Sequence, residues 1–154
     1  MKRCLPLLRG LKAGPYIPLV RATALAPPVI SKVQTDGSFN PDTKISRTAL
    51  AITKDDVFVN SFVRTYFDHE NSMESEWCSV LTALDFLRKK NYAAANLEND
   101  NLTVINNIIQ SKPPKDILYR FYYEMIFEQL PAFEWIGIRW IPRAQNKADK
   151  LFRI

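Results

Sequence analysis

Apolar and polar residues follow two different periods along the chain, and these periods predict where strands and helices lie. Residues 29–35, 49–52 and 57–67 are rich in β-branched and aromatic residues and predict three strands. The segment Thr-Lys-Asp-Asp between the second and third strands predicts a hairpin turn. Residues 72–90 have helical spacing and predict a helix that packs through one apolar face. That face consists of Trp77, Val80, Leu81, Leu84 and Leu87.

Strands and helices alternate in the second half of the chain. Two further strands are predicted over residues 93–97 and 135–141, where short apolar runs occur. The predicted helices cover residues 102–109, 117–130 and 145–154. The order of three strands, helix, strand, two helices, strand and helix predicts an α/β fold with a mixed five-stranded sheet flanked by helices.

Charge is distributed unevenly between the start of the chain and the rest. Residues 1–35 contain six lysines and arginines and no acidic residue. All sixteen acidic residues lie in residues 36–154, together with fifteen lysines and arginines. The net charge of +5 therefore belongs to the N-terminal part, and the body of the protein has no strong basic field of its own.

The first 28 residues predict a basic, proline-rich extension that precedes one domain at residues 29–154. Residues 1–28 hold five of the ten prolines, which exclude a long helix beyond the first dozen residues. The amphipathic, acid-free start is typical of a mitochondrial transit peptide and predicts a mitochondrial protein. A basic tail that binds RNA or another partner explains the pattern equally well, and this alternative allows a cytoplasmic or nuclear protein.

Few residues are available for soft metal ligands or disulfides. The chain has one histidine and two cysteines, Cys4 and Cys78, which are far apart in sequence. They provide too few ligands for a zinc site and indicate no disulfide framework. His69 follows the predicted hairpin, where we expect a surface residue. No apolar stretch reaches the roughly 20 residues that span a bilayer, so no membrane partner is expected.

Four acidic residues lie at the ends of predicted strands or near the starts of predicted helices: Asp36, Glu76, Asp100 and Asp149. Residues at the carboxyl ends of adjacent parallel strands meet at one rim of a sheet, so Asp36 and Asp100 can be neighbours. Clustered carboxylates raise each other's pKa and resist desolvation, and divalent cations with oxygen ligands neutralise them. Glu74 is the rival of Glu76, but the apolar spacing of the helix favours Glu76.

The surroundings of these acids form four motifs in a fixed order. They read Thr-Asp36-Gly-Ser, Ser-Glu76-Trp-x-Ser-Val, Leu-Glu-Asn-Asp100-Asn and Trp-Ile-Pro-Arg-x-Gln-Asn146-Lys-Ala-Asp149. With this order and spacing, the chain resembles the ribonuclease H family in its plant-type and reverse-transcriptase-like branch, over about residues 30–154. The resemblance implies a ribonuclease H-like fold, with three antiparallel strands followed by parallel strands. It also implies a metal-dependent endonuclease that hydrolyses phosphodiesters in the RNA strand of RNA–DNA hybrids.

The resemblance also implies a role for each acid, as catalytic and metal-binding residues for two Mg²⁺ or Mn²⁺ ions. Asp36 would bridge both ions, because it is the central acid of the family's site. Glu76 and Asp100 would complete one ion site, and Asp149 would hold the other ion. Such a pair of ions activates a water and stabilises the leaving oxygen of the phosphodiester.

Three further residues are implied to contact the substrate. Gly37 would allow close backbone approach to a nucleic-acid strand. Ser38 would hydrogen-bond a phosphate or a ribose 2′-hydroxyl, the group that distinguishes RNA from DNA. Asn146 would cap the last helix and orient Asp149.

Two departures from the family keep a second function open. The histidine that bacterial and retroviral members carry before the fourth acid is absent here, although the plant-type branch lacks it too. A lysine- and arginine-rich handle for the substrate is also absent. The alternative is therefore a non-cleaving ribonuclease H-like protein that binds structured RNA or is a structural component of a ribonucleoprotein such as a mitochondrial ribosome. Residues 1–28 would then contact the ribonucleoprotein partners.

Overall fold

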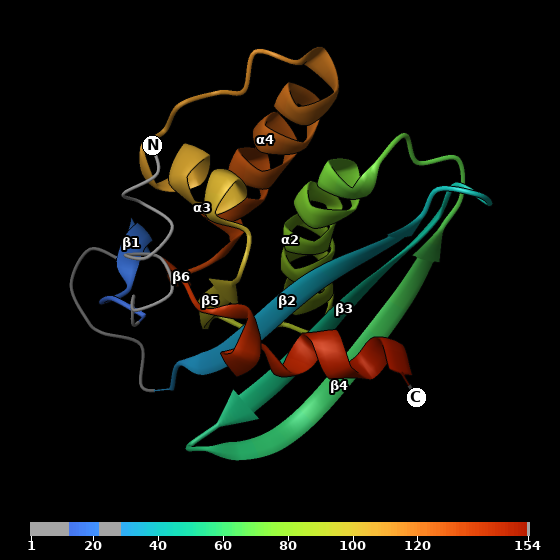
Figure 1. Ribbon diagram of the computed structural model, residues 1–154. Helices are drawn as coiled ribbons and strands as arrows, with labels where there is room; N and C mark the ends of the chain where they lie inside the picture. Colours follow the sequence, from blue (N-terminus) through green and yellow to red (C-terminus); the bar gives the residue numbers. More distant parts are fainter. Residues whose placement is uncertain (1–12, 22–28, 154) are drawn as a thin grey trace, which may run out of the picture.

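The computed structural model describes residues 13–21 and 29–153 (Figure 1). Six strands form one sheet in the order β1-β6-β5-β2-β3-β4. The strands are β1 Ile17–Arg21, β2 Ser31–Asn40, β3 Ile45–Lys54, β4 Val57–Tyr66, β5 Ala94–Asn99 and β6 Trp135–Trp140. The α-helices are α2 Ser72–Lys89, α3 Leu102–Ile109 and α4 Ile117–Gln129. Short 3₁₀ helices follow as η1 Leu130–Ala132, η2 Arg143–Gln145 and η3 Lys147–Arg153.

The sheet is mixed, as predicted. Strands β2, β3 and β4 are antiparallel, and β5 and β6 run parallel to β2. The predicted count of five strands is wrong, because β1 pairs antiparallel with β6 at the edge of the sheet. Strand β1 contains Pro18, which hides it in the sequence and which an edge strand tolerates. The amphipathic pattern of residues 1–12 lies outside the described residues.

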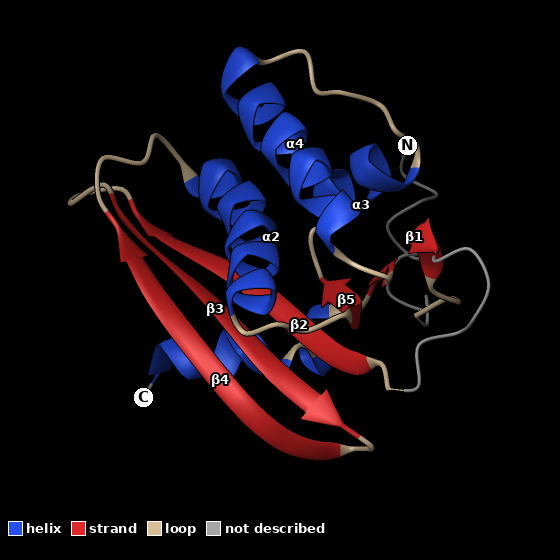
Figure 2. Cartoon of the chain, turned by 180° about the vertical axis from the view of Figure 1, so that it is seen from behind, coloured by secondary structure: helices blue, strands red, loops and turns tan. Residues whose placement is uncertain are grey.

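The two faces of the sheet are covered differently. Helix α2 packs on β2 and β3, and α4 packs on α2, so the α-helices share one face (Figure 2). The 3₁₀ helix η3 crosses β2 and β3 on the opposite face (Figures 1 and 2). The core lies between the sheet and α2, where four of the five residues predicted for the apolar face are buried. These four are Trp77, Val80, Leu84 and Leu87, and Leu81 is partly buried.

Most predicted elements occur within a few residues of their expected ends, and α3 has the predicted bounds. The largest difference is β2, which continues to Asn40, so Asp36 lies within a strand and not after one. The reason is the long antiparallel ladder with β3, which a local pattern does not reveal. The predicted last helix forms as two 3₁₀ segments, η2 and η3. Among the described residues, no helix is both long and apolar enough to cross a membrane.

Candidate metal centre

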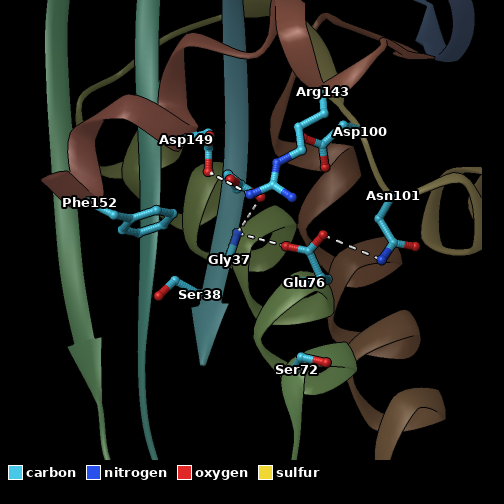
Figure 3. Close-up of a pocket in the computed structure, with 10 residues that line it drawn as sticks. Gly37, Ser38, Ser72, Glu76, Asp100, Asn101, Arg143, Asp149 and Phe152 are labelled. Carbon is cyan, nitrogen blue, oxygen red and sulfur yellow. Dashed lines mark hydrogen bonds and ion pairs between the residues drawn. The ribbon is translucent and has the colours of Figure 1, made fainter. Parts of the chain in front are cut away.

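All four predicted acids line one pocket of about 450 Å³, shown in Figure 3. The pocket opens where β2 and the end of β5 meet the start of α2 and the 3₁₀ segments η2 and η3. Its lining consists of Asp36, Gly37, Ser38, Ser72, Glu76, Asp100, Asn101, Arg143, Asp149 and Phe152. The predicted substrate residues Gly37 and Ser38 are therefore beside the acids, whereas the predicted Asn146 is not among the lining residues.

Three of the acids converge closely enough to share a cation. One carboxylate oxygen each of Asp36, Glu76 and Asp100 lies within 4.8 Å of the others. The strand register explains the meeting of the two aspartates, because the parallel ladder of β2 and β5 ends at the pair Thr35 and Asn99. Asp36 is the next residue of β2 and Asp100 directly follows β5, so both lie at the same rim.

Glu76 reaches this rim because α2 approaches β2 unusually closely at Gly37. A Cβ atom at this position would lie 2.3 Å from the carbonyl oxygen of Ser75 in α2. The Gly37 backbone N–H points at the acids and donates to Glu76 Oε1 at 2.8 Å and to Asp36 Oδ1 at 3.0 Å. Glycine is thus required here for helix packing, a different reason from the predicted approach of a nucleic-acid strand.

Asp149 enters the pocket from η3, on the opposite side of the Arg143 guanidinium from Asp100 (Figure 3). It is not part of the group of three acids that lie within 4.8 Å of one another. Its Oδ1 lies 3.6 Å from Arg143 Nη2, and the Arg143 side chain extends across the pocket toward it (Figure 3). The structure therefore brings three of the predicted metal ligands into one cluster. It places the fourth, Asp149, on the pocket wall beside the Arg143 guanidinium.

Asn146 connects the acidic cluster to β2 and to the last 3₁₀ helix through hydrogen bonds. Its Nδ2 donates to the Thr35 carbonyl oxygen at 2.8 Å and to Asp100 Oδ2 at 3.3 Å. Its Oδ1 accepts the N–H of Ala148 at 3.1 Å, so the predicted capping of the last helical segment is present. The side chain also contacts Asp100, and the predicted orientation of Asp149 stays a prediction. Asn146 is 2% exposed, and its predicted contact with the substrate stays a prediction as well.

The electrostatics of the cluster favour a cation. Burial, followed by repulsion from Glu76 and Asp100, raises the pKa of Asp36 to about 9. Burial is also the largest cause that raises the pKa values of Glu76 and Asp100. Hard divalent cations such as Mg²⁺ bind sites made of oxygen ligands, and this cluster offers only oxygens. The residues present therefore fit a divalent cation, which would offset the repulsion that raises these pKa values.

Helix α2 carries both Glu76 and its rival Glu74, and the structure separates them. Glu74 Oε2 accepts the Tyr122 hydroxyl at 2.6 Å, and Glu74 Oε1 accepts the N–H of Glu70 at 2.7 Å. His69, expected on the surface, is 6% exposed, and its Nε2 lies 4.0 Å from Glu74 Oε2. Glu74 is thus committed to a buried cluster that also encloses the histidine, whereas Glu76 lines the pocket.

Four pocket residues were not assigned to the site from the sequence: Ser72, Asn101, Arg143 and Phe152. Asn101 caps α3 through its Oδ1, which accepts the N–H of Val104 at 3.1 Å. Its Nδ2 donates to Glu76 Oε2 at 3.4 Å. An asparagine between Asp100 and a predicted helix is the one signal that could have identified it. Phe152 belongs to η3, where the local pattern carries no such signal.

The strand order, the helices on one face and the acidic rim together define a ribonuclease H-like domain. A sequence model described as "Reverse transcriptase-like" matches residues 34–152. The chain belongs to this reverse transcriptase-like family. No curated protein sequence matches the chain at a significant level.

Solved structures of ribonucleases H have the same fold. Ribonuclease H1 from the halophilic archaeon Halobacterium salinarum NRC-1 matches with a TM-score of 0.72 and 20% identity, over 79% of this chain and 92% of that chain. The N-terminal ribonuclease H domain of rv2228c from Mycobacterium tuberculosis matches with a TM-score of 0.70 and 18% identity, over 80% of this chain and 90% of that chain. LC11-RNase H1 in complex with an RNA/DNA hybrid matches with a TM-score of 0.69 and 15% identity, over 79% of this chain and 92% of that chain.

Proposed function

We propose that this protein is a metal-dependent ribonuclease H-type endonuclease that hydrolyses the RNA strand of RNA–DNA hybrids. The observation that carries the proposal is the cluster of Asp36, Glu76 and Asp100, whose oxygens lie within 4.8 Å and whose pKa values are all raised. The structural likeness to LC11-RNase H1, solved with an RNA/DNA hybrid, supports the choice of substrate.

The site would hold two divalent cations, Mg²⁺ or Mn²⁺. Asp36, Glu76 and Asp100 would hold one of them, and Asp36 and Asp149 the other. When bound, such ions supply charge neutralisation at the scissile phosphate and make water more acidic. The carboxylates are held in place for this role by protein donors, namely the Gly37 N–H on Glu76 and the Asn146 amide on Asp100.

Two residues on the pocket wall would orient the substrate. The Arg143 side chain is 77% exposed and offers a guanidinium that can pair with a phosphate of the bound strand. The Ser38 hydroxyl, next along β2 from Gly37, would hydrogen-bond a phosphate or a ribose 2′-hydroxyl. A preference for hybrids over duplex DNA would follow from the second contact.

The test is cleavage of single-stranded, duplex and hybrid substrates by the purified protein with Mg²⁺ or Mn²⁺. We expect hybrid cleavage, and Asp100→Asn should reduce its rate at least about 100-fold because a charged ligand is lost. Asp116→Asn is the matched control, since Asp116 caps α4 away from the pocket and asparagine caps equally well. Unchanged cleavage by Asp100→Asn would refute the proposed activity.

A second candidate is a non-cleaving protein that binds structured RNA within a ribonucleoprotein such as a mitochondrial ribosome. The charge distribution favours it, because the basic excess lies in residues 1–35 and not in the body that carries the pocket. Co-purification with large RNA and no cleavage with either metal would support this function. Deletion of residues 1–12 tests the tail without removing β1, and full RNA binding after the deletion would exclude a role for that segment.

A mitochondrial location is the matching proposal for the amphipathic start of the chain. Fusion of residues 1–28 to a fluorescent protein should direct it to mitochondria. Diffuse or nuclear fluorescence would instead favour the cytoplasmic or nuclear alternative.

A further inference from the structure

A second buried carboxylate lies close to the candidate metal centre but belongs to a different network. Glu98, on β5, is 1% exposed. Its Oε2 accepts the Tyr16 hydroxyl at 2.6 Å and Arg139 Nε at 2.6 Å, and it also pairs with Arg139 Nη2. Its Oε1 accepts Gln34 Nε2 at 2.9 Å. The charge of Glu98 is thus compensated by protein donors, among them the Arg139 guanidinium, and needs no metal ion.

Gln34 connects this network to the C-terminal 3₁₀ segments. Its Nε2 also donates to the carbonyl oxygen of Gln145 at 3.0 Å, and its Oε1 accepts the N–H of Lys147 at 2.9 Å. These two backbone groups flank Asn146, the residue that contacts Asp100. The Gln34 side chain, 4% exposed, therefore holds the backbone on both sides of Asn146, which in turn contacts the candidate metal centre.

The orientation of the Gln34 amide depends on Glu98. An ionised carboxylate only accepts hydrogen bonds, so it requires the NH₂ end of the amide. With the NH₂ end directed at Glu98, the oxygen end of Gln34 faces the Lys147 N–H. In this network Glu98 accepts hydrogen bonds from Tyr16, Gln34 and Arg139, which hold the carboxylate in place. The Gln145 carbonyl oxygen and the Lys147 N–H require the same orientation of the Gln34 amide, so all three contacts of the amide support one another.

The other end of the network is the short segment Gly14–Arg21, which contains β1. The Arg139 guanidinium lies 4.2 Å from the centre of the Tyr16 ring, and Arg139 Nη1 donates to the Gly14 carbonyl oxygen at 3.2 Å. Next to Tyr16, Ile17 pairs with Ile138 of β6. The segment is thus attached to the sheet by its backbone and to Glu98 by its side chain.

We infer that Gln34 and Glu98 are positioning residues through which Tyr16 and the β1 segment hold Gln145–Asp149 in the arrangement that the candidate metal centre needs. This inference rests on the proposed metal centre and adds a dependence on residues 14–21 that the pocket itself does not show. Loss of the Tyr16 hydroxyl weakens the constraint on Glu98. The Gln34 amide then holds Lys147 and Gln145 less firmly, and Asn146 and Asp149 move more freely.

The test compares Tyr16→Phe with a chemically matched control, Tyr122→Phe. Each variant removes a tyrosine hydroxyl that donates to a buried glutamate at 2.6 Å, but the Tyr122 bond goes to Glu74 in a separate cluster. Amide hydrogen exchange of Lys147 is measured in the full chain, with Leu84 of α2 as the reference for global opening. A general loss of stability moves both amides together, whereas a positioning role moves Lys147 alone.

We expect Tyr16→Phe to speed Lys147 exchange about three- to tenfold relative to Leu84, a fraction of what one hydrogen bond to a charged group contributes. Tyr122→Phe should leave this ratio unchanged. Gln34→Met, which removes all three hydrogen bonds of the amide, should have the larger effect. An equal ratio in Tyr16→Phe, Tyr122→Phe and the unaltered protein would overturn the inference.

Manganese binding provides the second readout. Titration calorimetry with Mn²⁺ should show about three- to tenfold weaker binding in Tyr16→Phe, matching the loss at Lys147. If the unaltered protein cleaves hybrid and Tyr16→Phe binds Mn²⁺ equally well, only this inference fails. If the unaltered protein binds Mn²⁺ without cleaving hybrid, the proposed nuclease activity fails, and the exchange of Lys147 still decides the inference.

Discussion

Asp36 and Glu98 lie on neighbouring strands of one sheet and are both almost fully buried. The pKa of Asp36 is nevertheless raised, whereas the pKa of Glu98 is lowered. Carboxylate oxygens of Glu76 and Asp100 lie within 4.8 Å of Asp36, and burial together with these two acids raises its pKa to about 9. The energy of this arrangement is unfavourable until a proton or a cation enters. A cluster of this kind is typical of a functional site.

Around Glu98 the closest polar groups are donors. Hydrogen bonds from Tyr16, Gln34 and Arg139 outweigh burial and keep its pKa below its usual range. The same sheet thus holds one carboxylate whose charge is balanced by an arginine and one that lies among other carboxylates. Burial alone does not mark a carboxylate as functional, whereas burial beside like charges with a raised pKa is typical of a functional site.

The largest effect should follow from breaking the compensated pair. Arg139→Met leaves Glu98 buried without its cation, which should lower the free energy of unfolding by about 3 kcal/mol. Urea denaturation measures the loss. The double variant Arg139→Met with Glu98→Leu should recover part of it, because no uncompensated charge is left. A loss below about 0.5 kcal/mol in the single variant would show that Arg139 does not compensate the buried charge of Glu98.

The spacing of the uncompensated cluster depends on Gly37. Gly37→Ala places a methyl group 2.3 Å from the Ser75 carbonyl oxygen and should destabilise the protein by about 1–3 kcal/mol. It should also weaken Mn²⁺ binding, since Glu76 is pushed from Asp36. Gly14→Ala is the control, because a methyl group there meets nothing within 4 Å. Equal stability of the two variants would contradict the close approach of α2 to β2.

Replacing one carboxylate of the cluster by an amide should stabilise the protein when no metal is present. At pH 8 the folded protein must keep a proton on Asp36 that the unfolded chain has released, and Asp36→Asn removes this cost, so we expect a gain of about 1–2 kcal/mol with a chelator. The same variant should lose the stabilisation that Mg²⁺ provides. Thermal unfolding with and without Mg²⁺ measures both effects, with Asp116→Asn as a charge-matched control. Destabilisation by Asp36→Asn in the chelator would mean that the cluster is already compensated.

The pH dependence is the smallest of these effects when it is expressed per pH unit. Because the pKa of Asp36 is raised in the folded state, the folded protein retains a proton that the unfolded chain releases near its ordinary pKa. Without metal, the free energy of unfolding should therefore fall as pH rises from about 5 to 9, by at most about 1.4 kcal/mol per pH unit. Saturating Mg²⁺ or Asp36→Asn should flatten this slope. A slope that persists in Asp36→Asn would assign it to other groups.

Local patterns predicted the elements of the core well and the edges poorly. Helix α2 was predicted from its apolar spacing, since periodicity reflects which face is buried. Strand β1 was not predicted, because five residues with a proline carry no clear period. The continuation of β2 past Asp36 was also missed, because pairing with β3 and not local preference extends it.

The candidate site was likewise predicted in its acidic residues and not in its long-range contacts. Asp36, Glu76 and Asp100 were predicted in order and do lie in one cluster, and Asp149 lies on the wall of the same pocket. The contact of Asn146 with Asp100 was not predicted, because it spans 46 residues of sequence. Contacts of that range leave no trace in the spacing of neighbouring residues.

The sequence by itself determined the helices and strands of the core, the family resemblance and the acids of the candidate site, since these depend on short motifs and periodic burial. Only the tertiary structure decided which carboxylates are compensated. Asp36 and Glu98 both lie within strands, and the local sequence does not show which of them will be surrounded by donors. The difference lies in donors from distant segments, Tyr16 and Arg139, which only folding brings to Glu98 and not to Asp36.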